Sequence, residues 1–277
     1  MFGPAGAARS EARPRRRGTI CLVSDTPPQV WRTLALVYVA TNARWGSGPL
    51  KKRCQRVMSR PEREAIHAIL ERVPAAVAQW SGGRAAMTPL DVVEVRRPLR
   101  SLSHSGGGNW WAAPRDCRDD VRQLAGGRQY DHIYVIWPSD GQTPLCGWGC
   151  TAGPRDGIDG AGFSAIVSDH WATLATDPDP EQGYVHEWLH AVESTYRDLG
   201  VTAEQVPTLH DAFLTSCRPP SEPPFGVGYN VHHDAGARTW RPWYEDLMTG
   251  QVRRPDGTGC FGMTPELWSL RTGRTTG

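Results

Sequence analysis

The pentapeptide His186-Glu187-Trp188-Leu189-His190 constrains this chain more than any other feature. With the chain's own composition, two histidines spaced in this way around a glutamate are expected about 0.01 times by chance. On an α-helix, residues four positions apart lie one above the other, so both imidazoles can reach one ion. The glutamate is then rotated by about 100° around the helix axis, beside such an ion without binding it. The pattern therefore predicts a metal-binding helix, which is expected to end near Gly200.

The segments before this helix alternate between strand and helix patterns. After Ser59, apolar residues at helical spacing predict a helix that Ser81-Gly82-Gly83 stops and that Pro74 is expected to kink. Apolar and β-branched runs predict strands, and Thr41-Asn42 is expected to end the first of them. The predicted strands are Leu34–Ala40, Leu90–Val95, Asp131–Trp137 and Gly162–Ser168, and a short helix is expected at Trp243–Thr249.

Composition along the chain predicts an arm followed by one domain. Residues 1–28 combine Arg9, Arg13, Arg15, Arg16 and Arg17 with glycine, alanine and proline and lack the apolar residues needed for order. They are expected to form a disordered basic arm, with a targeting leader or a misplaced start codon as alternatives. Residues 29–277 are expected to form one catalytic domain, with an α/β lobe at 29–200 and an irregular, partly helical lobe at 201–277.

Charge and hydropathy narrow the range of partners. The chain has 31 basic and 29 acidic residues, so no global field favours nucleic acid or an anionic membrane. The apolar run Leu34–Ala40 is too short to span a bilayer and only marginal as a signal-peptide core. We therefore expect no nucleic acid partner and no membrane span. The sequence leaves open the compartment, secreted or cytoplasmic, and the oligomeric state.

The seven cysteines are an odd number in a chain too long to need a disulfide framework. Cys146 and Cys150 frame the segment "CGWGC" and could close a small disulfide loop in an oxidising compartment, or they could be ordinary free thiols. No CxxC pair exists, so the sequence gives little support for a structural zinc knuckle.

The residue types of the pentapeptide fit hydrolytic metal chemistry. Neutral imidazole binds zinc, and catalytic zinc sites keep one position open for water. The ion lowers the pKa of that water and polarises a carbonyl, while a glutamate takes the proton and passes it to the leaving amine. The sequence therefore predicts one catalytic Zn²⁺ bound by His186 and His190, with Glu187 as the general base.

His186, Glu187 and His190 resemble the H-E-x-x-H motif of the zincin metallopeptidases. The resemblance implies an α+β fold with a mixed, mostly parallel sheet, a backing helix, an active-site helix and a small irregular or helical C-terminal lobe. It implies hydrolysis of a peptide or protein substrate. It also implies that Gly162–Ser168 is the edge strand that lies above the cleft and pairs with substrate. The resemblance is specific over five residues and only architectural elsewhere.

The motif does not specify the third metal ligand. A metzincin has glycine and histidine where this chain has Glu193 and Tyr196, which argues against that subfamily. Residues seven apart on a straight helix are separated by ~10 Å along its axis, so Glu193 is expected to orient a ligand or to be a polar helix residue. His210, which follows a proline and has apolar neighbours, is predicted to be the third ligand. The alternatives are an aspzincin-like Asp211, a gluzincin-like Glu245, His232 and His233.

Two further questions stay open at the level of sequence. Tyr229 and Tyr244 are candidates to donate to the oxyanion of a tetrahedral intermediate, although a buried tyrosine is more often a core residue. Two functions compete with the peptidase. One is a catalytically silent zinc-binding or interaction module that kept the helix without a productive cleft. The other is a non-proteolytic zinc amidase that acts on a small substrate.

Overall fold

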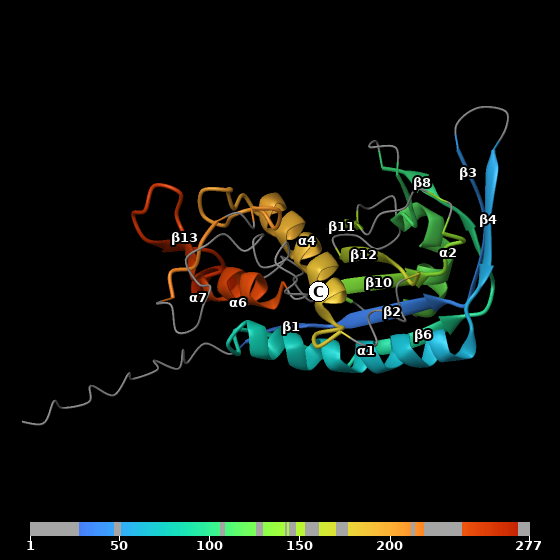
Figure 1. The fold of residues 1–277 in the computed structure, drawn as a ribbon, viewed down its shortest axis with the longest axis horizontal. Coiled ribbons are helices and arrows are strands. Elements are labelled where there is room, and N and C mark those ends of the chain that lie inside the picture. Colours follow the sequence, from blue (N-terminus) through green and yellow to red (C-terminus); the bar gives the residue numbers. More distant parts are fainter. Residues whose placement is uncertain are drawn as a thin grey trace, which may run out of the picture.

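The computed structural model shows a mixed α+β architecture (Figure 1). It describes residues 28–46, 51–105, 109–125, 130–141, 143, 148–152, 161–169, 177–211, 214–218 and 240–270. The predicted arm therefore lies outside the described residues except for Pro28. The same holds for Cys146, and with it the proposed Cys146–Cys150 pair, and for Tyr229, His232 and His233.

A five-stranded sheet forms the centre of the molecule, with the strand order β11-β12-β10-β2-β6. Neighbouring strands are parallel from β12 to β6, and every residue of β2 and β10 is buried, as expected for central parallel strands covered on both faces. All four predicted strands are present in this sheet. Its members are β2 (Thr33–Tyr38), β6 (Asp91–Val95), β10 (His132–Trp137), β11 (Trp148–Thr151) and β12 (Gly162–Val167).

The prediction that Gly162–Ser168 forms the edge strand is wrong. This segment is β12, the second strand of the sheet, and the edge is β11, which pairs antiparallel with it. The strand β11 has the sequence WGCT, only four residues with one β-branched member, inside a glycine-rich stretch. Such a segment lacks the β-branched and aromatic run that signals a strand, so the sequence did not reveal it.

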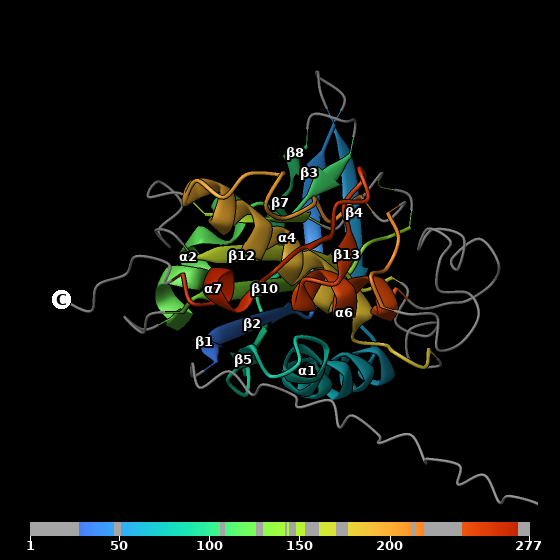
Figure 2. The same ribbon diagram turned by 90° about the vertical axis from the view of Figure 1, so that its left-hand side faces the viewer.

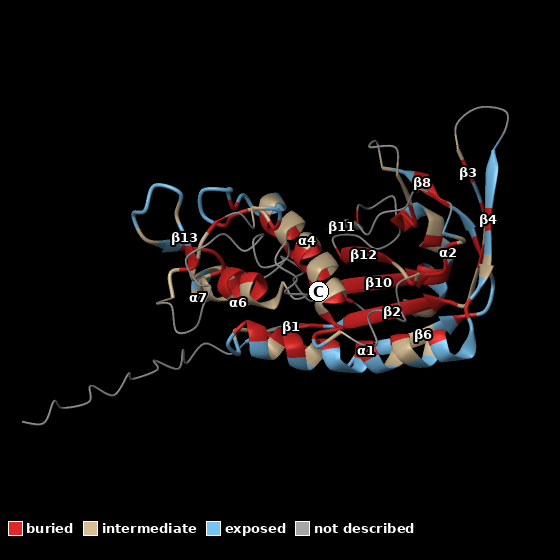
Figure 3. Ribbon diagram, viewed as in Figure 1, coloured by how far each residue is buried: buried red, intermediate tan, exposed pale blue. Residues whose placement is uncertain are grey.

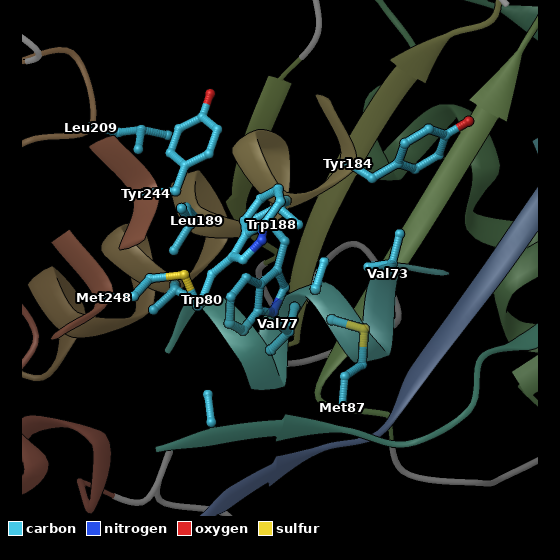
Figure 4. Packing of buried hydrophobic residues seen from close by; sticks show 14 of the residues in the cluster. Val73, Val77, Trp80, Met87, Tyr184, Trp188, Leu189, Leu209, Tyr244 and Met248 are labelled. Carbon is cyan, nitrogen blue, oxygen red and sulfur yellow. The ribbon is translucent and has the colours of Figure 1, made fainter. Parts of the chain in front are cut away.

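Two helices cover one face of the sheet. In α1 (Arg60–Trp80), the predicted start is confirmed by a capping box between Ser59 and Glu62, and Ser81 is the C-cap. Pro74 lies inside α1, which continues past it to Trp80. The motif helix is α4 (Gln182–Asp198), which confirms the predicted end near Gly200. Figure 4 shows Trp188 and Leu189 of α4 packed close to Val77 and Trp80 of α1.

The opposite face of the sheet is covered by elements that the sequence did not signal. They are the helix α2 and a three-stranded sheet of order β4-β3-β7, and their apolar residues share a core with Leu34, Leu36 and Tyr38 of β2. In Figure 2, α1 and α2 lie on opposite sides of the central strands. Thr41-Asn42, expected to end a strand, lies inside β3. The bounds are α2 (Pro114–Ala125), β3 (Ala40–Trp45), β4 (Lys52–Val57) and β7 (Leu99–Ser101).

Two small ribbons and a C-terminal lobe complete the described structure. The parallel pair consists of β1 (Gln29–Trp31) and β5 (Ala85–Met87), and the antiparallel pair of β8 (Ser103–His104) and β9 (Trp110–Trp111). The C-terminal lobe contains α6 (Arg241–Thr249), β13 (Val252–Arg253), β14 (Cys260–Phe261) and α7 (Pro265–Trp268). The helix α6 confirms the short helix predicted at Trp243–Thr249.

Burial follows these layers. Figure 3 shows the central strands as buried and the outer strand β4 as largely exposed. The C-terminal lobe is joined to α4 through indole rings, because Trp268 of α7 stacks on Trp188 with ring centroids 6.1 Å apart. Among the helices of the described segments, none is long and apolar enough to cross a membrane.

A disulfide between Cys217 and Cys260, 43 positions apart in the sequence, ties the segment before α6 to β14. A cross-link of this kind lowers the entropy of the unfolded chain. Replacing both cysteines by serine should lower the free energy of unfolding by about 2–4 kcal/mol, measured by denaturant unfolding. Reductant should destabilise the wild type by a similar amount and leave the double variant unchanged. Wild-type stability that does not respond to reductant would show that the bond does not form.

Candidate metal centre

Two of the predicted ligands lie on one face of α4, one helical turn apart. The Nε2 atoms of His186 and His190 are 3.2 Å apart, and their rings are perpendicular, with an interplanar angle of 89°. The orientation of the helix follows from its apolar residues, since Trp188, Leu189 and Val192 are buried in the core between α1 and the sheet. Burial of this apolar stripe leaves the two imidazoles directed away from the core.

His210 completes a group of three histidines. Its Nε2 lies 3.1 Å from Nε2 of His190, and the ligand nitrogens of the three side chains all lie within 4.8 Å of one another. Three nitrogens bound at about 2.0–2.1 Å to a tetrahedral ion would be ~3.3 Å apart, so two of the observed separations are already close to that value. The group could therefore hold a metal ion. His210 is exposed, so the site is open to solvent on its side.

The segment that carries His210 is held by hydrogen bonds on both sides of its backbone. The amide of Leu209 donates to Oε2 of Glu193 at 3.2 Å, and the carbonyl of Leu209 accepts from Nε1 of Trp243 at 3.0 Å. These bonds tie the residue before His210 to α4 and to α6. Arg197 of α4 donates to the carbonyls of Val201 and Val206, each at 2.9 Å. The hydrogen bonds that join Glu193 and Arg197 of α4 to residues 201–209 therefore hold His210 beside His190.

Glu193 occupies the position expected of a residue that orients metal ligands. Its Oε2 lies 3.9 Å from Nδ1 of His190, and Arg197 donates to its other oxygen at 3.5 Å. Burial alone would raise the pKa of Glu193, but the nearby imidazole of His190, the hydrogen bond from the amide of Leu209 and the charge of Arg197 lower it. The carboxylate therefore stays ionised and can fix the His190 ring and the His210 segment together.

The alternative third ligands that the structure describes have other partners. The carboxylate of Asp211 accepts from the amide of Thr208 at 2.9 Å and so closes the turn that contains His210. Glu245 forms ion pairs with Arg241 at 2.7 Å and with Arg218 at 3.6 Å. Neither belongs to the group of histidines. Tyr196, at the metzincin histidine position, is buried beside Trp268.

Tyr244 of α6 holds the first histidine. Its hydroxyl lies 3.0 Å from Nδ1 of His186, on the side of the ring away from the other histidines. Burial, with the nearby charge of Glu187, raises the pKa of Tyr244, so its hydroxyl stays neutral. When Nε2 of an imidazole binds a metal, Nδ1 carries the proton, which the Tyr244 hydroxyl can accept. In this geometry the hydroxyl of Tyr244 contacts the ring of His186 and is placed to fix the orientation of that ring.

The carboxyl group of Glu187 is buried, and one of its oxygens has no hydrogen-bond partner among the described residues. Burial raises the pKa of its carboxyl to about 8, and Oε2 is buried with no hydrogen-bond partner in the described part of the chain. Burial, helped by the neighbouring His190 and His210, lowers the pKa of His186 to about 3, so this imidazole is neutral, as a ligand must be. An unpaired buried carboxylate is costly, and a metal ion with its water beside the histidines would compensate it. The residues therefore fit a metal ion.

A buried histidine behind the motif helix is a residue that the sequence analysis missed. Nε2 of His132 lies 2.8 Å from Oγ of Ser164, and this hydroxyl donates to the carbonyl of Glu187 at 2.8 Å. Since the serine proton is used in that bond, His132 must donate through Nε2. Burial lowers the pKa of His132 to about 3, which keeps it neutral. A lone histidine at the start of an apolar strand gave no signal of this link between sheet and helix.

The edge strand β11 approaches the motif helix unusually closely. A Cβ atom at Gly149 would lie 2.2 Å from the carbonyl oxygen of Glu187 and 2.5 Å from Cβ of His190. Farther along, the amide and the hydroxyl of Thr151 donate to Oγ of Ser194 at 3.2 and 2.8 Å. Only glycine permits this contact, which places the sheet edge directly beside the candidate metal centre.

Comparisons with known proteins identify no relative of this chain, because neither a family model nor a curated protein matches it. The function must therefore be inferred from the geometry of the site.

Replacing Gly149 with alanine should push β11 away from α4. We expect a loss of about 1–3 kcal/mol in the free energy of unfolding, because the new methyl group would overlap the helix backbone. The matched control is Gly183→Ala, in the first turns of α4, where an added Cβ meets no atom within 4 Å. This control should be neutral or slightly stabilising. Equal stability of the two variants would contradict the close approach.

In the metal-free protein, the contribution of Glu187 to stability should fall as the pH rises through the range in which its carboxyl ionises. Its pKa rises from the usual 4.5 to about 8, so between these values the folded state keeps a proton that the unfolded state releases. This contribution to stability is full below the pKa that Glu187 has in the unfolded state. It is lost as the pH rises through the pKa of the folded state.

The variant Glu187→Gln stays neutral throughout this range. Its advantage in unfolding free energy over the wild type, measured by denaturant unfolding in EDTA, should therefore grow between pH 5 and pH 8. The exposed Glu64→Gln on α1 is the control and should show no such trend. An advantage of Glu187→Gln that is constant or decreases with pH would contradict the buried, unpaired state of the carboxyl.

Proposed function

We propose that this protein is a zinc-dependent metallopeptidase of the zincin type. The observation that carries the proposal is the convergence of His186, His190 and His210, together with the buried, unpartnered Oε2 of Glu187, the residue that follows His186 on α4. Three neutral imidazoles with an open fourth position form a typical catalytic zinc site, and imidazole also suits other divalent transition metals.

The residues of the site have distinct proposed roles. When bound, zinc would supply an activated water and polarise the scissile carbonyl. Glu187 takes the proton of the attacking water and passes it to the leaving amine, a role that suits a carboxyl whose pKa lies near neutrality. Tyr244 and Glu193 hold the imidazoles of His186 and His190 in the orientation that ligation needs.

The edge of the sheet supports an extended peptide as the substrate. The strand β11 lies beside α4 at Gly149, and its outer edge pairs with no strand in the described part of the chain. An exposed strand edge can bind an extended chain through its main-chain amides and carbonyls. This feature favours a peptidase over an amidase for a small substrate. The Cys217–Cys260 disulfide supports an oxidising compartment for the protein.

The proposal is tested by metal analysis together with Glu187→Gln. The purified protein should contain about one zinc per chain. The variant should keep the metal but lose peptide cleavage by a factor of about 10²–10⁴, the usual contribution of a general base. His210→Ala should lose both metal and activity, whereas Glu64→Gln, the same change on an exposed face of α1, should keep both.

Different failures of this test have different meanings. If Glu187→Gln cleaves peptides at the wild-type rate, or loses its metal, the proposed role of Glu187 is wrong. If the zinc-loaded protein cleaves no member of a broad peptide library, the chain is a silent zinc-binding module or, where it hydrolyses small amides, an amidase.

A further inference from the structure

A second concave site lies at the other end of the molecule from the C-terminal lobe. It is formed around the sheet β4-β3-β7, at the end of the molecule where the β3–β4 hairpin projects in Figure 1. The cavity has a volume of about 450 Å³, within the usual range of small-molecule sites. Its lining consists of Asn42, Arg44, Gly46, Lys51, Arg53, Arg100, Ser101, Leu102 and Trp110.

The lining is strongly basic. Three arginines and a lysine converge on the cavity, and no carboxylate lines it. Within the described segments, the side chains of Arg44, Lys51 and Arg100 have no hydrogen bond or ion pair, and Arg53 donates only to the amide oxygen of Asn42, at 2.5 Å. The positive charges of this pocket are therefore not neutralised by the fold.

The register of the sheet forces two of these charges together. Arg44 of β3 stands directly opposite Arg53 of β4 in an antiparallel pair, and opposite Ser101 of β7 on its other side. Directly opposed residues share one face of the sheet, and like charges in that position are destabilising. Both arginines are exposed, so neither is needed to fill a core. An anion bound between them would remove the repulsion.

The carboxylate that is bonded to the pocket wall is already in use. Asp116 of α2 accepts from the hydroxyls of Ser101 and Ser103, both at 2.7 Å, and from the amide of Ala113 at 3.0 Å. It fixes the β7 side of the pocket without lining it. The pocket wall also contains the half-buried indole of Trp110, which packs near His104 and Trp45. Anion-binding donors and an aromatic surface therefore stand side by side.

We infer that this pocket binds a ligand that carries two or more phosphate charges, such as a pyrophosphate group or its esters. Guanidinium groups bind phosphate oxygens through paired, charge-assisted hydrogen bonds. The three guanidinium charges of the pocket are more than one carboxylate can neutralise, which favours a ligand with several negative charges. A nucleoside diphosphate and a sugar diphosphate share this chemistry, and the ring of Trp110 offers a surface to either. The inference does not depend on the proposed peptidase activity, because none of the lining residues belongs to the metal centre.

Isothermal titration calorimetry of the full chain with inorganic pyrophosphate tests the inference. We expect saturable binding with a Kd of about 1 mM or tighter in 150 mM salt, and a Kd at least ~10-fold weaker in the double variant Arg44→Gln/Arg100→Gln. The control Arg60→Gln/Arg253→Gln removes the same charge from other exposed positions and should bind as the wild type does. Absence of saturable binding, or equal weakening in both double variants, would overturn the inference.

Two further measurements keep the result specific to the pocket. Arg44→Gln relieves the repulsion with Arg53, so its Tm without ligand should equal or exceed that of the wild type. A lower Tm would mean that Arg44 has a structural role, and would count against a binding role. If the heat of pyrophosphate binding is unchanged in Arg44→Gln/Arg100→Gln, pyrophosphate binds outside this pocket, for example to a metal ion. This result would also overturn the inference.

Titrating ADP and a sugar diphosphate that carries no nucleoside, in parallel, distinguishes the two classes of ligand. Tighter binding of ADP than of pyrophosphate supports the inference and identifies a nucleotide, whose base stacks on Trp110. Tighter binding of the sugar diphosphate supports it and identifies a phosphorylated saccharide. Trp110→Ala should then reduce the gain over pyrophosphate while leaving pyrophosphate binding unchanged.

Discussion

The rotation of α4 about its own axis determines the rest of this structure. The helix buries Trp188, Leu189 and Val192 between α1, the sheet and the C-terminal lobe, and the stack of Trp188 on Trp268 fixes it further. Turning the helix would expose these side chains at a cost of several kcal/mol. With the rotation fixed, His186 and His190 share the outer face, and Glu193 one turn farther on can hold the segment of His210. A hydrophobic constraint thereby fixes the geometry of a polar site.

The buried carboxylates of this chain show the difference between a structural acid and a reactive one. Glu62 is fully buried, but its oxygens accept from Arg56 at 3.0 Å, Ser168 at 2.6 Å and the amide of Ser59 at 3.2 Å. Glu187 is buried to a similar extent at its Oε2 atom and has no such partner there. An unpaired buried carboxyl either keeps its proton, as the raised pKa of Glu187 indicates, or ionises at a cost in stability. Such a cost is typical of functional sites.

The sequence predicted what depends on local spacing and missed what depends on tertiary contacts. The helix of His186 and His190 follows from periodicity, and His210 was found because a histidine after a proline and among apolar residues can return to the helix. The link from Glu193 to Leu209 and the bond from Tyr244 to His186 join residues 16 and 58 positions apart, which no local pattern encodes. The strand β11 was missed because its pairing depends on the close approach of Gly149 to α4, which only the folded backbone reveals.

The metal centre and the basic pocket use opposite physical means to attract their ligands. In the metal centre, burial lowers the pKa of His186 and so provides a neutral nitrogen inside a site of low dielectric. In the basic pocket, Arg44, Arg53 and Arg100 remain exposed and charged, so their field extends into solvent and is screened over about 8 Å at physiological salt. Ionic strength therefore acts strongly on the basic pocket and weakly on the buried histidine. Salt concentration therefore separates the two sites, because it perturbs the exposed charges of the basic pocket while the buried metal centre serves as an internal reference.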